Sequence, residues 1–150
     1  MFPLPKGFST LMPILMLPEA EKTIQLYEIV FDAKVHEMAI DEKTNKVLNC
    51  RIAINESSFF ISDIFPEGGR GTEKQFLYLY VNDVDALFKK SQEFGFKALS
   101  QPIDMFYGDR IATIEDLHGN IWKIAQKKKE ITLREAINAK EQDNSEKESK

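Results

Sequence analysis

The stretch QPIDMFYGDRIATIEDLHGNIWKIAQ, residues 101–126, decides the fold that the sequence predicts. Within it, residues 110–115 and 121–125 show the two-residue alternation of a pleated strand. The break between them is made of turn formers, because Gly119 allows a positive φ and Asp116 can accept hydrogen bonds from nearby amides. The stretch therefore predicts a β-hairpin.

A cluster of unlike side chains stands just before the hairpin. Phe106 and Tyr107 are aromatic, Gly108 is flexible, and Asp109 and Arg110 are oppositely charged. Aromatic and charged groups at the start of a strand are typical of the rim of a pocket. We expect this cluster to form one edge of a binding site.

The same order of elements is predicted twice along the chain. In the first half, strand 11–17 precedes a helix that starts at Pro18 and Glu19, and strands 35–40, 47–54 and 58–64 follow. In the second half, strand 76–81 precedes a helix from Asp83 to Gly95, and strands 98–105, 110–115 and 121–125 follow. An offset of about 64 residues aligns the halves, as it pairs Leu15 with Leu79 and Glu19 with Asp83. The pattern predicts a duplicated strand-helix-three-strand module.

The helices show apolar residues at the spacing of one buried face. The predicted inward residues are Ala20, Ile24, Tyr27 and Phe31 in the first helix and Val84, Leu87, Phe88 and Phe94 in the second.

Composition excludes several classes of function. The chain has 150 residues, of which 43% are hydrophobic and 29% charged, enough for one compact domain with a real core. Its formal net charge of −4 argues against nucleic acid or an anionic membrane as a partner. The single cysteine, Cys50, lies in a predicted strand and is expected to be buried and reduced. With no apolar run long enough to span a membrane and no signal-peptide pattern in MFPLPKGFST, a cytoplasmic location is expected.

Three segments lie outside the two modules, 11–64 and 76–126. Residues 1–10 are predicted to form an N-terminal arm, and the glycine-rich loop 66–74 is a possible lid over a bound molecule. In the charged tail 127–150, Thr132 and Glu135 have the spacing of a capping box, which predicts a short helix followed by disorder from Lys140. This tail is either a solvated segment without function or a contact for a partner.

The motif in residues 101–126 resembles that of the vicinal oxygen chelate superfamily, also called the glyoxalase/bleomycin resistance/dioxygenase superfamily, and in particular its PhnB-like branch. The matching residues are Pro102, Asp104, Phe106, Tyr107, Gly108, Asp109, Arg110, Asp116, Gly119 and Trp122, while Leu117 and Asn120 replace a proline and a histidine. The resemblance implies an α+β fold in which two tandem βαβββ modules form a curved mixed sheet around a cup. It also implies a homodimer.

Metal enzymes of this superfamily carry histidine and glutamate ligands on the first and last strand of each module. The resemblance places those ligands at Met12, Ile61, Phe76 and Lys123. None of these side chains is a suitable ligand, and a protonated lysine repels a cation. The only histidines, His36 and His118, lie in different modules without metal-binding spacing. The sequence therefore predicts no metal, and it contains no glycine-rich loop between a strand and a helix that would hold a nucleotide-like cofactor.

Strand alternation predicts which side chains face the cup when the ligand positions set the phase. The predicted ligand-binding residues are Asn49, Arg51, Tyr78, Tyr80, Phe106, Tyr107, Arg110 and Lys123. The cations among them favour an anionic or carbonyl-bearing ligand, and the aromatic rings favour a planar one. The alternative is that Arg51 and Arg110 form structural bridges with Glu37, Asp104 or Asp109.

Three functions remain open on the sequence alone. The first is a metal-free protein that binds a small, partly aromatic or anionic molecule. The second is an enzyme with an unusual metal site or with acid and base groups such as Glu37, Tyr78 and Lys123, one of which would need a pKa near neutrality. The third is a structural or partner-binding module that uses its terminal helix.

Overall fold

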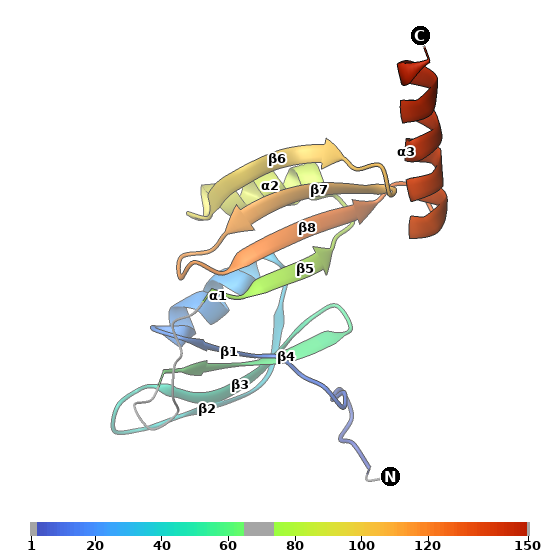
Figure 1. The fold of residues 1–150 in the computed structure, drawn as a ribbon. Coiled ribbons are helices and arrows are strands. Elements are labelled where there is room, and N and C mark those ends of the chain that lie inside the picture. The colour runs from blue at the N-terminus through green and yellow to red at the C-terminus, as the bar shows by residue number, and fades with distance from the viewer. Residues whose placement is uncertain (1–2, 65–73, 150) are drawn as a thin grey trace. The chain divides into compact units, whose positions relative to one another are not determined.

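A computed structural model describes residues 3–64 and 74–149 (Figure 1). The described residues form two compact units: one comprises those within 1–75 together with 117–119, and the other those within 76–116 and 120–150. The expected lid, loop 66–74, lies outside the described residues apart from Lys74.

The first unit contains one helix and a four-stranded sheet. Its elements are β1 (Ile14–Leu17), α1 (Ala20–Val30), β2 (Lys34–Ile40), β3 (Val47–Ile54) and β4 (Ser57–Asp63). The strand order is β1-β4-β3-β2, with β1 parallel to β4 and the other pairs antiparallel.

The second unit repeats this arrangement and adds a terminal helix (Figure 1). Its elements are β5 (Phe76–Tyr80), α2 (Val84–Glu93), β6 (Lys97–Asp104), β7 (Asp109–Glu115), β8 (Ile121–Lys127) and α3 (Leu133–Glu148). The order β5-β8-β7-β6, with β5 parallel to β8, is that of the first unit. The α+β class and the duplicated βαβββ module, both predicted from the sequence, are confirmed, and the strands form two four-stranded mixed sheets.

The predicted hairpin is β7 and β8, and the carboxylate of Asp116 holds its turn together. One Asp116 oxygen accepts from the Asn120 amide at 3.0 Å, and the other accepts from Asn120 Nδ2 at 3.0 Å and Trp122 Nε1 at 3.2 Å. Asp116, Asn120 and Trp122 are all buried. A buried carboxylate is stable only when its oxygens are bonded, so this set of donors explains why these residue types occur together.

Helix α1 begins later than the sequence predicts. Pro18 precedes the helix and Glu19 is its N-cap residue, with a left-handed φ of 52° and no capping hydrogen bond from its side chain. Asp63 at the end of β4 takes over this role, since its Oδ1 accepts from Ala20 N at 3.1 Å and its Oδ2 from Val47 N at 2.6 Å. A carboxylate distant in sequence thus caps the helix, which local pattern reading could not show.

The predicted core faces of the helices are largely correct. All four predicted inward residues of α1, and Val84 of α2, are buried. Leu87 and Phe88 are half-buried, and Phe94 is exposed over 39% of its surface. It is the C-cap residue of α2, and Gly95 at φ 90° turns the chain so that Phe96 enters the core instead.

In strand β4, the residues on the open face of the sheet alternate with those that were predicted to lie there. Cross-strand partners share a face of a sheet, and Ile61 is paired with Leu15 and Cys50, which are all buried on the α1 side. Phe60, paired with Ile14 and Arg51, is on the open face instead. Phe60 therefore stands where Ile61 was predicted to face the cup.

Helix α3 extends beyond the short helix that the sequence predicts. Thr132 caps it as expected, accepting from Glu135 N at 3.1 Å. Instead of ending near Lys140, the helix continues to Glu148. The tail is rich in helix formers, and residues 140–149 are all exposed, so a pair such as Asp143 and Lys147, 2.8 Å apart at i and i+4, stabilises this part of the helix without burial.

Candidate functional site

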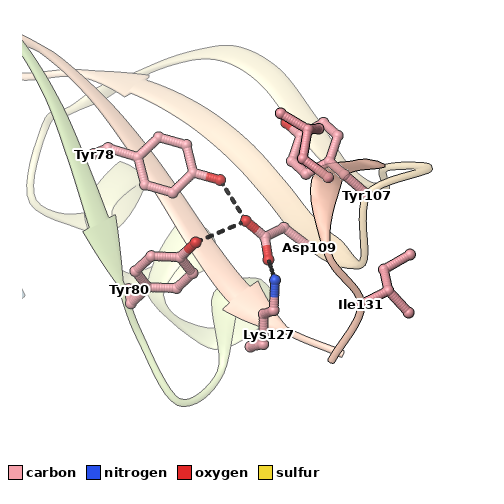
Figure 2. Close-up of a pocket in the computed structure, with 7 residues that line it drawn as sticks. Tyr78, Tyr80, Tyr107, Asp109, Lys127 and Ile131 are labelled. Atoms are coloured by element: carbon pink, nitrogen blue, oxygen red, sulfur yellow. Dashed lines mark hydrogen bonds and ion pairs between the residues drawn. The ribbon is translucent and has the colours of Figure 1, made fainter. Parts of the chain in front are cut away.

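The second unit has a hollow of about 370 Å³ on the open face of its sheet, near the ends of β5, β7 and β8 (Figure 2). The residues that line it are Tyr78, Tyr80, Tyr107, Asp109, Lys127, Ile131 and Leu133. Three tyrosine rings and two aliphatic side chains thus surround one carboxylate and one ammonium group. This is the composition of a small-molecule site: mostly apolar, with a few polar groups that converge.

Asp109 is the polar centre of the hollow. Its side chain is buried, and its Oδ2 accepts from Tyr78 Oη at 2.6 Å and from Tyr80 Oη at 3.0 Å. Lys127 Nζ lies 3.2 Å from the other carboxylate oxygen (Figure 2). Two neutral donors and one cation therefore stabilise the charged form of Asp109.

These contacts set the protonation states of the site. Burial by itself raises the pKa of Asp109, but the hydrogen bonds from Tyr78, Lys127 and Tyr80 outweigh burial, and the pKa is lowered overall. The pKa of Tyr78 is strongly raised by desolvation and by its bond to Asp109, and the same causes raise the pKa of Tyr80. At neutral pH the carboxyl group is ionised and both hydroxyl groups keep their protons.

Strand geometry brings these groups together. Tyr78 and Tyr80 are two residues apart on β5, so both side chains lie on one face, and their rings are 5.3 Å apart. Asp109 and Lys127 are direct partners in the β7–β8 ladder and share that face. The site therefore rests on three adjacent strands of one sheet.

The segment after β8 closes the hollow because it is tied to Gly108. The amides of Lys128 and Lys129 both donate to the Gly108 carbonyl, at 2.9 and 3.1 Å. Gly108 has a φ of 96°, and a Cβ at this position would lie only 2.3 Å from the Lys129 carbonyl oxygen. Only glycine fits this approach, which brings Ile131 and Leu133 to the hollow.

The structure brings several predicted ligand-binding residues together. Tyr78, Tyr80 and Tyr107 line the hollow. Phe106 packs edge-on against Tyr107, with ring centroids 5.2 Å apart, and the ammonium of Lys140 lies 4.4 Å from the Phe106 ring. Lys123 is on the same sheet face as its partner Tyr78 but does not line the hollow.

Arg110 is not where the sequence prediction places it. It is adjacent to Asp109 on β7 and therefore points to the opposite face. There it bonds Asp85 of α2, with Nε to Oδ2 and Nη2 to Oδ1 both 2.9 Å, and Asp104 of β6 at 3.2 Å. Arg110 therefore forms the structural bridge that the sequence analysis gave as the alternative, with Asp104 as one of its partners.

The remaining predicted residues, Asn49 and Arg51, lie on β3 of the first unit. Both face the open side of that sheet, Asn49 exposed and Arg51 half-buried. The predicted alternative of a bridge from Arg51 to Glu37 is not formed: the two are direct partners between β3 and β2, yet no ion pair joins them among the described residues.

Sequence reasoning missed three residues of the hollow, Lys127, Ile131 and Leu133, and it placed Asp109 at the expected edge of the binding site but not among the ligand-binding residues. The sequence prediction assigned the wrong face to alternate residues of β7. Because it placed Arg110 toward the ligand, it placed the neighbouring Asp109 on the opposite face. For Lys127 a signal existed, because an antiparallel ladder that continues outward from Glu115 and Ile121 pairs residues 109 and 127. Ile131 and Leu133 depend on the Gly108 contact, which has no local signal.

A second hollow, of about 450 Å³, lies at the start of α1 in the first unit. It is lined by Glu19, Ala20, Glu21, Lys22, Asn45, Lys46 and Asp63. Asp63, its one buried charged group, is fully used by the backbone amides of Ala20 and Val47. The hollow therefore has a structural explanation.

The side chains at the expected metal positions do not fit a metal. Phe60, which replaces Ile61 on the open face, offers a phenyl ring, and Met12, Phe76 and Lys123 offer no oxygen or imidazole donor. Within residues 3–64 and 74–149, no three histidine, cysteine, aspartate or glutamate side chains are grouped so that they could hold an ion. Burial raises the pKa of Cys50 to about 11, so this thiol stays protonated.

The chain is similar in sequence to a known protein family and to a mycobacterial protein. A family model described as the Glyoxalase/Bleomycin resistance protein/Dioxygenase superfamily matches residues 11–124. An uncharacterized protein of Mycobacterium tuberculosis is 27% identical over 134 residues, covering 83% of this chain and 78% of that protein.

No helix among the described residues is both long and apolar enough to cross a membrane.

Two solved structures show the same fold at low sequence identity. The fosfomycin resistance protein FosX from Listeria monocytogenes has a TM-score of 0.66 and 14% identity, covering 89% of this chain and 99% of that chain. A PhnB protein from Bacillus cereus has a TM-score of 0.64 and 16% identity, covering 79% of this chain and 99% of that chain.

Proposed function

The chain belongs to the Glyoxalase/Bleomycin resistance protein/Dioxygenase superfamily, and we propose that it is a metal-free member that binds a small, partly aromatic or anionic molecule. The binding site of this proposal is the hollow of the second unit. Its ligand is held by shape, ring contacts and charge rather than by coordination to an ion.

The observation that carries the proposal is the arrangement of tyrosine rings around the Asp109–Lys127 pair. Both tyrosine hydroxyl protons are directed at Asp109, so the lone pairs of Tyr78 and Tyr80 remain as acceptors for a ligand. Lys127 has 42% of its side chain exposed and has donors beyond the one directed at Asp109. An aromatic carboxylate would accept from Lys127, and a phenol would also donate to a tyrosine oxygen.

The same protonation states argue against acid or base catalysis by this site. The raised pKa makes Tyr78 a weaker acid, and the lowered pKa makes Asp109 a weaker base, because both pKa values move away from neutral pH. The groups are suited to fixed recognition, which supports binding over turnover.

The PhnB-like branch, a homodimeric state and a cytoplasmic location remain part of the proposal. The PhnB-like assignment is supported by the Gly108-Asp109-Arg110 motif and by the fold shared with the Bacillus cereus PhnB protein. The sequence identity to that protein is too low to transfer a function to this chain. The domain limits, 11–126 with modules 11–64 and 76–126, are also part of the proposal, and the family match over residues 11–124 supports them.

The proposal is tested by a ¹⁵N-HSQC titration with 2-naphthoate, compared with the uncharged 2-naphthalenemethanol. We expect saturable shifts at Tyr78, Tyr80 and Lys127, and weaker binding of the alcohol. Lys127→Gln should weaken naphthoate binding about tenfold, because a charged hydrogen bond is lost. Tyr107→Ala should weaken the binding of both naphthoate and the alcohol.

Two matched variants serve as controls. Lys89→Gln removes the same charge from an exposed site on α2, and Phe94→Ala removes an exposed ring outside the hollow. Neither should change the affinity. Equal weakening by a control and a hollow variant would show that the probe binds elsewhere.

A further inference from the structure

Arg51 in the first unit is a half-buried cation without an anionic partner among residues 3–64 and 74–149. Its side chain is in the row of directly paired residues Ile14, Phe60, Arg51 and Glu37, which crosses the open face of the sheet. Among the residues that the structure describes, no carboxylate forms an ion pair with it, and its Nε is buried without a hydrogen-bond partner. A buried guanidinium donor that is left unbonded favours an anion as its partner.

The contact that Arg51 does make is with the N-terminal arm, residues 3–10. The guanidinium carbon lies 4.6 Å from the centroid of the Phe8 ring, and that ring is 6.0 Å from the ring of Phe60. Gly7, at φ 84°, comes so close that an added Cβ would lie 3.0 Å from Arg51 Nη1. Phe8 thus provides the aromatic surface for Arg51 and Phe60.

The arm is held on the sheet by little besides this ring. Residues 3–7, 9 and 10 are exposed, and Phe8 is the one half-buried residue among them. The hydrogen bonds at Phe8 and Ser9 run within the N-terminal segment, from Phe8 N to the Pro5 carbonyl and from Ser9 Oγ to the Leu11 carbonyl. A segment anchored by one aromatic contact is weakly bound and readily displaced.

We propose that Phe8 is an intramolecular occupant of a second binding site, formed by Arg51 and Phe60, and that a planar aromatic carboxylate displaces it. Such a ligand replaces the Phe8 ring with its own ring. It also supplies the negative charge that Arg51 lacks, which Phe8 cannot do. The arm therefore lowers the apparent affinity of this site by the fraction of molecules in which Phe8 is seated.

None of the residues of this site lines the hollow in the second unit. The two sites are also reported by different nuclei. Binding at Arg51 is read from the Nε–Hε signal of that side chain and from the amides of β3, and binding at the hollow from the amides of β5 and β8. Failure of one proposal is thus visible without failure of the other.

The test is a titration of the full chain with 2-naphthoate, followed by the Arg51 Nε–Hε signal and the ¹⁵N heteronuclear NOE of Gly7 and Phe8. In the unchanged protein the NOE should fall as the Arg51 signal shifts, since the arm is released when the probe binds. Phe8→Ala should tighten binding at Arg51 about fivefold. Phe8→Ala combined with Arg51→Gln should abolish it.

Leu11→Ala is the matched control, since Leu11 directly follows the arm and is 85% exposed. It should leave the affinity at Arg51 unchanged. The proposal is overturned when Phe8→Ala leaves the affinity unchanged or lowers it, when no binding occurs at Arg51 even in Phe8→Ala, or when the double variant binds as tightly as Phe8→Ala.

Discussion

Arg110 of β7 and Asp85 of α2 form a two-point ion pair, with both nitrogen–oxygen distances at 2.9 Å. The pair joins the helix to the sheet on the face opposite the hollow, and Asp104 adds a third contact at 3.2 Å. Arg110 is therefore assigned to holding α2 in place rather than to ligand contact.

The first prediction concerns this ion pair. Arg110→Gln and Asp85→Asn should each lower the midpoint of urea unfolding modestly, since both partners reach solvent and water screens the pair. The double variant should lose less than the sum of the single losses, because the two residues act together. Naphthoate affinity at the hollow should not change, and a tenfold loss in Arg110→Gln would return this residue to the ligand site.

The second prediction concerns Asp109. Asp109→Asn should destabilise the protein by about 1–3 kcal/mol, because it removes a buried charge that accepts from two hydroxyl groups and pairs with Lys127. Denaturation in guanidinium chloride measures the change. Glu93→Gln, an exposed carboxylate on α2, is the control and should be close to neutral.

The third prediction gives the pH dependence of this carboxylate. The pKa of Asp109 is lowered in the folded state from its usual 3.8. The stabilisation is therefore fully present above pH 3.8 and lost as the pH falls through the lower, folded-state pKa. From pH 3.8 down to about pH 2, below the usual pKa of aspartate, the parent protein should lose more stability than Asp109→Asn. Parallel pH profiles would contradict the hydrogen-bonded arrangement.

Much of this architecture could be predicted from residue patterns, because periodicity and turn residues are local signals. The duplicated module, the β7–β8 turn and the buried face of α1 all follow from such signals. Which residues of β4 and β7 face the open side does not follow from such signals, since both faces of these strands carry apolar residues. In β4, Phe59 and Ile61 alternate with Phe60, and in β7, Ile111 alternates with Ala112. Only the cross-strand pairing places Phe60 and Asp109 on the open faces.

The site depended still more on contacts between distant residues. Tyr78, Tyr80 and Tyr107 could be predicted because aromatic residues alternating on a strand, or placed before one, indicate a pocket. The caps and tethers could not, since Asp63 capping α1 and Lys129 packing on Gly108 join residues far apart in sequence.

The fourth prediction concerns that tether. Gly108→Ala should cost at least about 2 kcal/mol, because alanine is strained at a φ of 96° and its Cβ would meet the Lys129 carbonyl. The amides of Lys128 and Lys129 should also exchange faster with deuterium, as their acceptor moves. Gly95→Ala, at φ 90°, controls for backbone strain and should leave those two amides protected. Unchanged exchange in Gly108→Ala would show that the segment is held by other contacts.

The fifth prediction concerns the hairpin turn. Asp116→Ala should destabilise the protein by roughly 3 kcal/mol, because three donors of Asn120 and Trp122 lose their acceptor in a buried place. Urea unfolding measures the loss, and Trp122 fluorescence should report the changed surroundings of the indole. Asp83→Ala removes a carboxylate that caps α2 at an exposed position and should cost only about 1 kcal/mol.

Native mass spectrometry of the purified protein, combined with elemental analysis, tests the central claim most directly. Binding without a metal predicts the mass of the polypeptide, alone or with an organic molecule that Lys127→Gln or Tyr107→Ala releases, and only substoichiometric zinc, nickel or iron. One equivalent of such a metal per chain, retained in the native spectrum and removed by a chelator together with ligand binding, would contradict the account.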